Sequence, residues 1–289
     1  INNLFLNMIQ NIDELINICS QVRRDIVRMV HGAQSGHPGG SLGCVEYFVS
    51  LYFSIMKHDK KFKMDGLNED LFFLSNGHIS PVLYSVLARS GYFPIDELNS
   101  FRKINSRLQG HPTTHEKLPG VRIASGSLGQ GLSVAIGSAL TKKLNNDKEI
   151  VYCLCGDGEL QEGQIWEALM YAGSKKVNNI ILTIDVNKQQ ICGSTDDILS
   201  LGNLKEKFYA FNWQVLEVKN GNDINEVLSV LNEAKNNLFN DYPMCVLLNT
   251  EMGCGIDYMM GSHKWHGIAP NDEQLEVALN QLQETLGDY

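Results

Sequence analysis

Several features that would assign a protein to a broad class are missing from this 289-residue sequence. Its longest apolar stretch, residues 47–56, is far shorter than the roughly 20 residues that a transmembrane helix needs. The N-terminus has no basic region followed by an apolar core and a cleavage site, which a signal peptide would show. No Pro/Ser-rich linker, repeat or low-complexity tract divides the chain. We therefore expect a cytoplasmic protein that does not bind a membrane.

Positive charge is also scarce. The chain has 24 Lys and Arg against 33 Asp and Glu, a net charge of -9, and no basic run, which argues against a nucleic-acid partner. Its seven cysteines form no Cys-x-x-Cys pair, so we expect reduced thiols. A zinc site is not indicated either, because the His pair with a spacing of four, His111 and His115, flanks Pro112 and cannot lie on one helix.

Apolar residues make up 43% of the sequence, which is enough for a large core. Buried strands are predicted at 71–75, 149–155, 180–186, 214–218 and 244–249. Helices are predicted at 13–34, 42–56, 81–89, 163–175, 224–236 and 272–286, with another that opens at 126–131 and ends near 144. Alternating strands and helices predict an α/β fold, a single doubly wound domain with a mostly parallel central sheet flanked by helices. We expect this domain to span residues 13–289, after an N-terminal extension of residues 1–12, in which Met8 is a candidate start.

The most informative motif is Gly156-Asp157-Gly158-Glu159, which follows one buried strand, with Asn187 at the end of the next. The intervening helix of about 13 residues covers roughly 20 Å, and a strand of about 7 residues covers roughly 23 Å back. The lengths match, so Asp157 and Asn187 should meet at the carboxyl edge of the sheet, where open α/β sheets bind ligands.

A carboxylate and an amide oxygen at this edge suit a hard cation such as Mg²⁺, with Ca²⁺ or Mn²⁺ as alternatives. Gly156 and Gly158 would let the main chain approach a phosphate closely and take unusual dihedral angles. The alternative is an ordinary turn in which Asp157 only caps the following helix. The pairing with Asn187 favours the metal site, which is typical of enzymes that hold thiamine diphosphate through magnesium.

Histidines gather in loops rich in Gly and Pro. Imidazole suits proton transfer at neutral pH and hydrogen bonding to sugar hydroxyls. A loop histidine can also simply bond a nearby carbonyl, which is our interpretation of His31 and His58. The loop histidines are His37, His78, His111, His263 and His266.

Six motifs in order make the sequence resemble transketolase along nearly the whole chain. They are Ser-Gly-His-Pro-Gly-Gly-Ser-Leu-Gly (35–43), Ser-Asn-Gly-His (75–78), Gly-His-Pro (110–112), the glycines of 126–131, Gly-Asp-Gly-x-Leu-Gln-Glu-Gly (156–163) and Ser-His-Lys-Trp-His-Gly (262–267).

The resemblance implies roles for particular residues. The metal would be held by Asp157, Asn187 and the main chain at Gln189. Glu162 would lie at a subunit interface and communicate with a partner's catalytic Glu. The sugar channel, with its proton transfers, would be lined by His37, His111 and His263. Thiamine diphosphate would contact His78, Gly126, Ser127, Leu128, Gly156, Asp157, Gly158, Glu159, Asn187 and His263. Which of His263 and His266 faces the cofactor is left open by the sequence.

The resemblance also implies a partner. A single-chain transketolase is more than twice as long, and its second domain carries the Glu that activates the cofactor's aminopyrimidine ring. We therefore predict the diphosphate-binding subunit of a two-chain transketolase, which moves a two-carbon ketol group from a ketose phosphate to an aldose phosphate. Its partner would be the C-terminal subunit with the pyrimidine-binding domain, in an α₂β₂ heterotetramer. The alternatives are a related subunit for another ketose phosphate and a non-catalytic paralogue.

Overall fold

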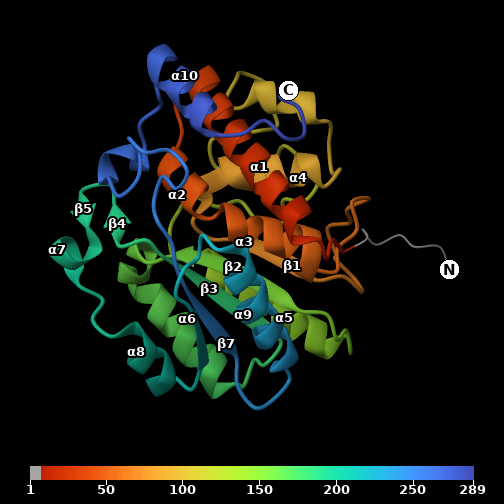
Figure 1. Ribbon diagram of the computed structural model, residues 1–289. Coiled ribbons are helices and arrows are strands. Elements are labelled where there is room, and N and C mark those ends of the chain that lie inside the picture. Colours follow the sequence, from red (N-terminus) through yellow and green to blue (C-terminus); the bar gives the residue numbers. More distant parts are fainter. Residues whose placement is uncertain (1–7) are drawn as a thin grey trace.

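The computed structural model describes residues 8–289, so residues 1–7 of the predicted N-terminal extension lie outside the described part. A parallel five-stranded sheet with the order β1-β2-β3-β7-β6 forms its centre (Figure 1). All five predicted strands are confirmed. They are β1 (Leu71–Leu74), β2 (Val151–Gly156), β3 (Ile180–Val186), β6 (Gln214–Val218) and β7 (Met244–Asn249).

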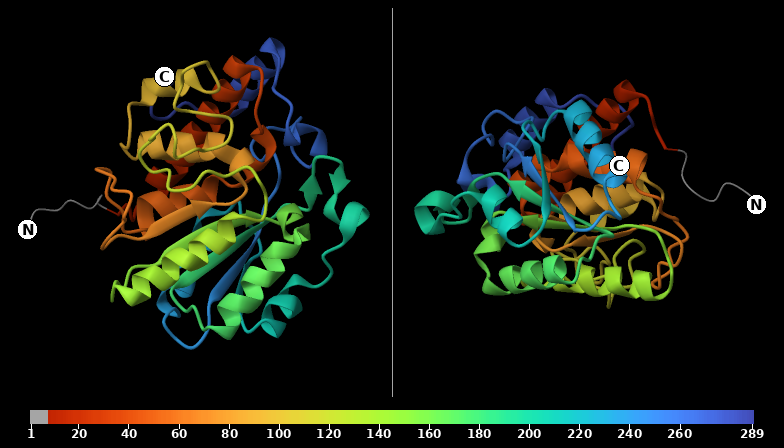
Figure 2. Two further views of the ribbon diagram at one scale, coloured as in Figure 1. Left: turned by 180° about the vertical axis from the view of Figure 1, so that it is seen from behind. Right: turned by 90° about the horizontal axis from the view of Figure 1, so that it is seen from below.

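Helices cover both faces of the sheet, as the view from below shows (Figure 2). One side holds α1 (Ile12–Ala33), α2 (Pro38–Gly43), α3 (Val45–Ser50), α4 (Ser80–Arg89), α9 (Ile224–Asn236) and α10 (Asp272–Gln281). The other side holds α5 (Gly131–Leu144), α6 (Gly163–Ser174) and α8 (Leu204–Ala210). Each face of the sheet has its own hydrophobic core, and β2 contributes to both. Tyr152 and Leu154 pack into the core on the first side, and Cys153 and Cys155 pack into the core on the second. The predicted doubly wound fold is confirmed.

Two predicted helices have different bounds in the structure. The helix predicted over 42–56 is instead α2, α3 and a π-helical turn, η1 (Leu51–Ile55). Pro38, whose fixed φ suits the first helical turn, starts α2 earlier than predicted. The predicted helix 272–286 stops at Gln281, because α1 side chains take the main-chain groups beyond it. Arg24 donates to the carbonyl of Leu282, and Gln21 accepts from two amides further on.

Short elements follow β3 that the sequence analysis did not predict. A two-stranded hairpin, β4 (Gln189–Gln190) and β5 (Gly193–Ser194), leads into α7 (Thr195–Leu199). Three 3₁₀ turns lie elsewhere at loops that the site uses: η2 (Gly77–Ile79), η4 (Gly158–Gln161) and η5 (His263–His266). A fourth, η3 (Ile95–Ser100), precedes the loop of His111. These elements are too short for a hydrophobic period to mark them.

The strand register brings the functional loops to one edge. Gly156 of β2 lies beside Asp185 of β3, and the amide of Asp157 donates to the Asp185 carbonyl at 3.0 Å. On the other side of β3, the amide of Thr250 donates to the carbonyl of Val186 at 3.3 Å. The loops after β2, β3 and β7 therefore start side by side. Among residues 8–289, no helix has the length and apolar character that crossing a bilayer requires.

Candidate active site

A cavity of about 360 Å³ opens above the carboxyl ends of the parallel strands. Its lining includes eleven of the predicted site residues: His37, His78, Gly126, Leu128, Gly156, Asp157, Gly158, Glu159, Glu162, Asn187 and Gln189. Ser127, His111 and His263 are not part of this lining, although the His111 ring lies at its margin, 6.1 Å from that of His37. Side chains to which the sequence analysis gave no role also line it: Asn76, Gln161, Asp185, Gln190 and Ile191. His266, which the sequence left open as the alternative to His263, lines it as well.

Asp157 joins the ends of two strands. One carboxylate oxygen accepts from the amide of Gly158 at 2.8 Å, and the other accepts from the amide of Lys188 at 2.6 Å. The predicted meeting of Asp157 with the end of β3 is thus confirmed, and the carboxylate also caps η4. Burial, followed by the nearby carboxylate of Asp185, raises the pKa of Asp157 to about 7.

Asp185 and Asn187 form the second half of this polar edge. Asn187 donates its amide to Asp185 at 2.8 Å, and its carbonyl oxygen accepts from the amide of Gln189 at 2.9 Å. Thr250, after β7, donates to the other Asp185 oxygen at 2.5 Å. Burial raises the pKa of Asp185 as well. The Asp that stands two residues before Asn187 was the available signal, because alternate residues of a strand point the same way.

Two carboxyl groups are therefore buried side by side. Burial raises the pKa of both groups, and repulsion from Asp185 adds to the shift of Asp157. The donor set of carboxylate, amide and main-chain oxygens suits a hard divalent cation. No cluster of three or more His, Cys, Asp or Glu side chains that could hold a metal occurs in the described chain, so such a cation would depend on amide and main-chain oxygens.

The carboxylate of Glu159 accepts three hydrogen bonds from protein groups. Its carboxylate accepts from the Ser75 hydroxyl at 2.5 Å and from the amides of Gly129 and Gly156 at 2.7 and 3.2 Å. It therefore ties the ends of β1 and β2 to the turn that opens α5. Glu159 also lines the cavity, so its predicted contact with the cofactor stays a prediction, while its hydrogen bonds hold the walls of the cavity together.

The turn of 126–131 packs so closely against its neighbours that two of its glycines leave no room for a side chain. At Gly126, which has a φ of +135°, an added Cβ would lie 2.9 Å from the His111 ring. At Gly131 it would lie 2.5 Å from the side chain of Ser75. The expectation of unusual dihedrals at Gly156 and Gly158 is wrong, since neither has a positive φ. Their surroundings leave room instead, with no protein atom within 3.4 Å of an added Cβ.

Four histidine rings form one wall of the site. The ring of His37 lies 5.1 Å from that of His78 and 5.6 Å from that of His266, and the rings of His78 and His266 are 5.1 Å apart. His111 completes the group beside His37. Burial is the first cause of lowered pKa in all four, and in His37 the positive charges of neighbouring groups help to lower the pKa to about 4. His37 and His78, whose pKa values lie furthest below 6.5, are therefore neutral near pH 7.

The structure corrects the assignment of His263. Its side chain is exposed and does not line the cavity, whereas His266 does. The reason is how η5 lies against α2. The carbonyl of Trp265 lies close to Gly39, and Gly267 lies beside the His37 ring, so His266 is held among the other histidines. The structure thus places His266, and not His263, at the cavity.

The pH dependence of the free energy of unfolding tests whether His78 is neutral in the folded protein. Its pKa is lowered well below the ordinary value of 6.5, so the unfolded chain takes up a proton there before the folded chain does. Stability from this group is thus present above about pH 6.5 and is lost as the pH falls. Relative to His78→Gln, the wild type should lose at most about 1.4 kcal/mol for each pH unit below 6.5. Urea unfolding of both proteins at pH 7, 6 and 5 measures this difference.

Exposed His115 provides the control, since replacing it with Gln should leave the pH dependence of the wild type unchanged. Parallel stability curves for the wild type and His78→Gln would contradict a neutral His78 in the folded protein.

Buried polar atoms without hydrogen-bond partners gather at the same cavity. The described chain has such atoms in four of the lining side chains, namely Nδ1 of His37, Oδ1 of Asn76, Oε1 of Gln190 and Nδ1 of His266. Leaving a buried polar atom unpaired costs about 1–3 kcal/mol. Their concentration here indicates that the cavity is shaped to bind a polar ligand, which would supply the missing partners.

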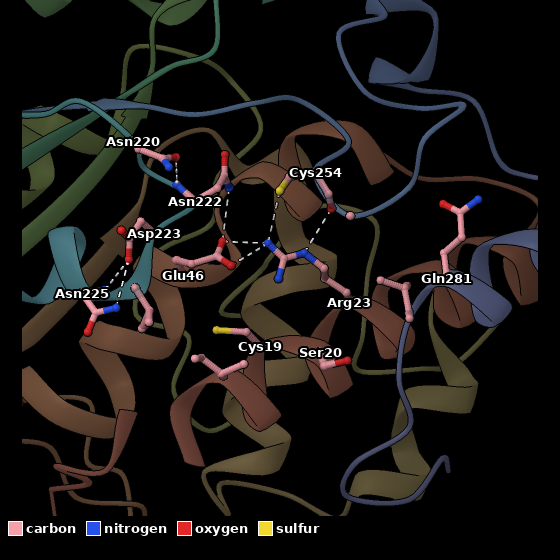
Figure 3. A pocket seen from close by; sticks show the side chains of 14 residues that line it. Cys19, Ser20, Arg23, Glu46, Asn220, Asn222, Asp223, Asn225, Cys254 and Gln281 are labelled. Atoms are coloured by element: carbon pink, nitrogen blue, oxygen red, sulfur yellow. Dashed lines mark hydrogen bonds and ion pairs between the residues drawn. The ribbon is translucent and has the colours of Figure 1, made fainter. Parts of the chain in front are cut away.

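A larger cavity of about 500 Å³ lies elsewhere, between α1, α9 and α10 (Figure 3). Its central groups satisfy one another. Arg23 pairs with Glu46 at 2.7 Å and donates to the carbonyl of Cys254 at 3.1 Å. Asn222 also donates to Glu46 at 3.2 Å. Within residues 8–289, no side chain that lines this cavity has a buried polar atom without a partner. The smaller cavity at the strand ends is therefore the better candidate for the active site.

Comparisons with known proteins agree with this geometry. The family described as "Transketolase, thiamine diphosphate binding domain" matches residues 15–287. An apulose-4-phosphate transketolase subunit of Actinobacillus succinogenes is 39% identical over 275 residues, which cover 94% of this chain and 97% of that protein. The 6-deoxy-6-sulfo-D-fructose transketolase subunit SqwG of a Clostridium species is 36% identical, with coverage of 86% and 89%.

Solved structures show the same fold. Transketolase from Campylobacter jejuni aligns with a TM-score of 0.87 at 37% identity, over 94% of this chain and 43% of that one. Transketolase from Leishmania mexicana also gives 0.87, at 29% identity, over 98% of this chain and 43% of that one. The chain thus spans less than half of these transketolases but nearly the whole of the subunits named above. The predicted resemblance is confirmed, and the chain belongs to the transketolase family, whose thiamine diphosphate binding domain it carries.

Proposed function

We propose that this chain is the diphosphate-binding subunit of a two-chain transketolase, transferring a two-carbon ketol group from a ketose phosphate to an aldose phosphate. The observation that carries the proposal is the convergence of Asp157 and Asn187 at one sheet edge beneath the histidine wall. The named subunits among its relatives support the two-chain form.

The cation would be magnesium, with calcium or manganese as substitutes. Asp157, Asn187 and the main-chain carbonyl of Gln189 would hold it. The buried carboxyl pair fits this assignment, because a divalent cation would remove the repulsion between Asp157 and Asp185. The cation would also offset the charge of a diphosphate in an acidic protein.

Thiamine diphosphate supplies, when bound, the reactive carbon that accepts and releases the two-carbon unit. This chain's contribution is to bind and orient. Gly156 and Gly158 leave room for the diphosphate, while Gly126, Ser127 and Leu128 form the opposite turn. Ser127 is exposed, so we expect only its main chain to take part.

The histidines would hold and move protons on the sugar. A neutral imidazole has one nitrogen that donates and one that accepts, so it can serve a hydroxyl in either direction. We assign this task to His37, His111 and His266. The Nδ1 atoms of His37 and His266 have no partner among the described residues and are therefore available to a ligand.

The partner would be a C-terminal subunit that carries the pyrimidine-binding domain, and we propose an α₂β₂ heterotetramer. Exposed apolar side chains mark the contact surfaces that we propose. Met260 and Ile268 lie in or beside the loop of 253–267, and Met170 and Tyr171 lie on α6. Glu162 immediately precedes α6 and lines the cavity, and its side chain makes no capping bond to the helix, so it is free to face the partner's catalytic Glu. A cytoplasmic location belongs to the proposal, and the seven unpaired cysteines agree with it.

The substrate is a second question. The relatives are named for apulose 4-phosphate and 6-deoxy-6-sulfo-D-fructose, both ketoses that carry an acid group. A ketose of this kind, outside the common sugar phosphates, is therefore the second candidate donor.

The decisive test compares the chain with and without its partner. The purified chain, given magnesium, thiamine diphosphate, a ketose phosphate and an aldose phosphate, should show no ketol transfer, because the group that activates the aminopyrimidine ring would come from the partner. Transfer should appear when the C-terminal subunit is added. Transfer by the chain alone, linear in its concentration, would contradict the need for a partner. Absence of magnesium-dependent cofactor binding under both conditions would identify a non-catalytic paralogue instead.

A further inference from the structure

Arg102 lies between the loops that carry His37 and His111. It follows η3, and its amide donates to the carbonyl of Leu108 at 2.8 Å, which closes a short loop ahead of His111. Its φ of +57° is uncommon for a residue with a side chain. Such strained positions persist where the surrounding contacts require them.

The side chain of Arg102 touches both histidine loops. Its Nη1 donates to the hydroxyl of Ser35 at 3.0 Å, two residues before His37. Its guanidinium lies against Gly110, the residue before His111, where an added Cβ would be 2.4 Å from Cζ. Only glycine permits this approach, so Gly110 and Arg102 are fitted to each other.

The charge of Arg102 has no carboxylate partner among the ion pairs of the described residues. Its Nε is buried without a hydrogen bond. Arg107, five residues later, contrasts with it, because Glu97 holds that guanidinium through two bonds at 2.7 and 2.9 Å. Arg102 is thus a permanent, unneutralised cation beside the histidine wall.

We propose that Arg102 is a positioning residue that fixes the separation and tilt of the His37 and His111 rings, now 6.1 Å apart at 56°. The inference rests on the proposed function, in which both histidines act on the sugar. One planar side chain sets both loops at once, since its contacts with Ser35 and Gly110 are close to the two rings in sequence. A lysine could keep the charge but lacks the forked guanidinium that makes both contacts.

The same charge acts on the titration of both rings. Burial is the first cause of the lowered pKa of His37, followed by His266, Arg102 and His111. Burial and Arg102 lower the pKa of His111. The titratable and charged neighbours of His37 and His111 are therefore Arg102, His266 and His78, and none of them is a carboxylate. Removing the charge of Arg102 should therefore raise both pKa values.

The test separates position from charge with Arg102→Gln and Arg102→Lys, and uses Arg107→Gln as the matched control. In the isolated chain, NMR titration of the His37 and His111 rings reads the effect of the charge, because Arg102→Lys keeps the charge that Arg102→Gln removes. In the complex with the C-terminal subunit, kcat and KM are measured against pH for a ketose phosphate and for the same ketose without phosphate. Affinity for thiamine diphosphate and thermal unfolding report on folding.

Arg102→Gln should lower kcat by roughly 10-fold to 100-fold for both sugars, because misplaced catalytic groups lose about that much. Its ring titrations and the acid limb of kcat should move to higher pH. Arg102→Lys should keep the acid limb near that of the wild type but still lose kcat. Arg107→Gln should match the wild type, and cofactor affinity should stay within about twofold in all variants, since the cofactor ligands lie elsewhere.

Unchanged kcat and unchanged ring titrations in Arg102→Gln would overturn the proposal. So would a loss confined to KM for the phosphorylated sugar, which would make Arg102 a direct ligand of the acid group. If Arg102→Gln does not fold, Arg102→Lys still decides whether position matters. If the wild-type complex transfers no ketol group at all, the proposed function fails, while the NMR titration still tests the inference about Arg102.

Discussion

Asp157→Ala should abolish cation-dependent binding of thiamine diphosphate to this chain. Asp157 is 2% exposed, and its carboxylate joins the ends of β2 and β3, where the cation would lie. Without it, the cation loses its one charged protein ligand, and the diphosphate would meet the remaining carboxyl of Asp185 unscreened. We expect affinity to fall at least about 100-fold, which matches or exceeds the usual effect of disturbing a metal site. Titration calorimetry with and without magnesium measures it.

Two controls sharpen this experiment. Asp196→Ala removes an exposed carboxylate from nearby α7 and should bind the cofactor like the wild type. The wild type in excess chelator should reproduce the loss seen with Asp157→Ala. Full affinity of the wild type in chelator would show that the cofactor binds without a cation, and unchanged affinity in Asp157→Ala would remove Asp157 from the site.

His37→Ala and His266→Ala should each lower turnover in the assembled enzyme by roughly 10²–10⁴-fold, the usual range for a residue that transfers protons. Both rings line the cavity and have a buried nitrogen without a partner among the described residues. Because these nitrogens make no bond that folding depends on, melting temperatures should change little. Steady-state rates and thermal unfolding, measured on the same preparations, separate the two effects.

His263 provides the matched control three residues away. Its exposed side chain is outside the cavity, so His263→Ala should keep turnover within a few-fold of the wild type. A large loss in His263→Ala with near-normal rates in His266→Ala would restore the original assignment of His263. A large loss of stability with normal turnover in His37→Ala would mean that this ring is structural.

Much of the fold was predictable because it depends on local pattern and length. Five apolar runs predicted five buried strands, and each is confirmed. The crossover from Asp157 to Asn187 followed from matched lengths, since a helix and a strand of similar reach return the chain to the same edge. The motif order predicted the family without reference to any contact.

Other features depended on contacts between segments far apart in the sequence. His263 and His266 are separated by three residues in a 3₁₀ turn, where positions i and i+3 face the same way, so their spacing could not distinguish them. Packing of η5 against α2 decided which of the two histidines faces the cavity. The end of α10 was likewise set by Arg24 and Gln21 of α1, more than 250 residues earlier in the chain.

The sequence by itself thus determined which strands form, where Asp157 and Asn187 meet, and which loops carry histidines. Only the tertiary structure decided which histidines share a cavity, that Asp185 belongs to the polar edge, and that Arg102 links Ser35 to Gly110. The physical reason is the range of the interactions. Strand burial and crossover length act within one unit of the chain, whereas ring contacts and the guanidinium bridge exist only after separate loops have packed together.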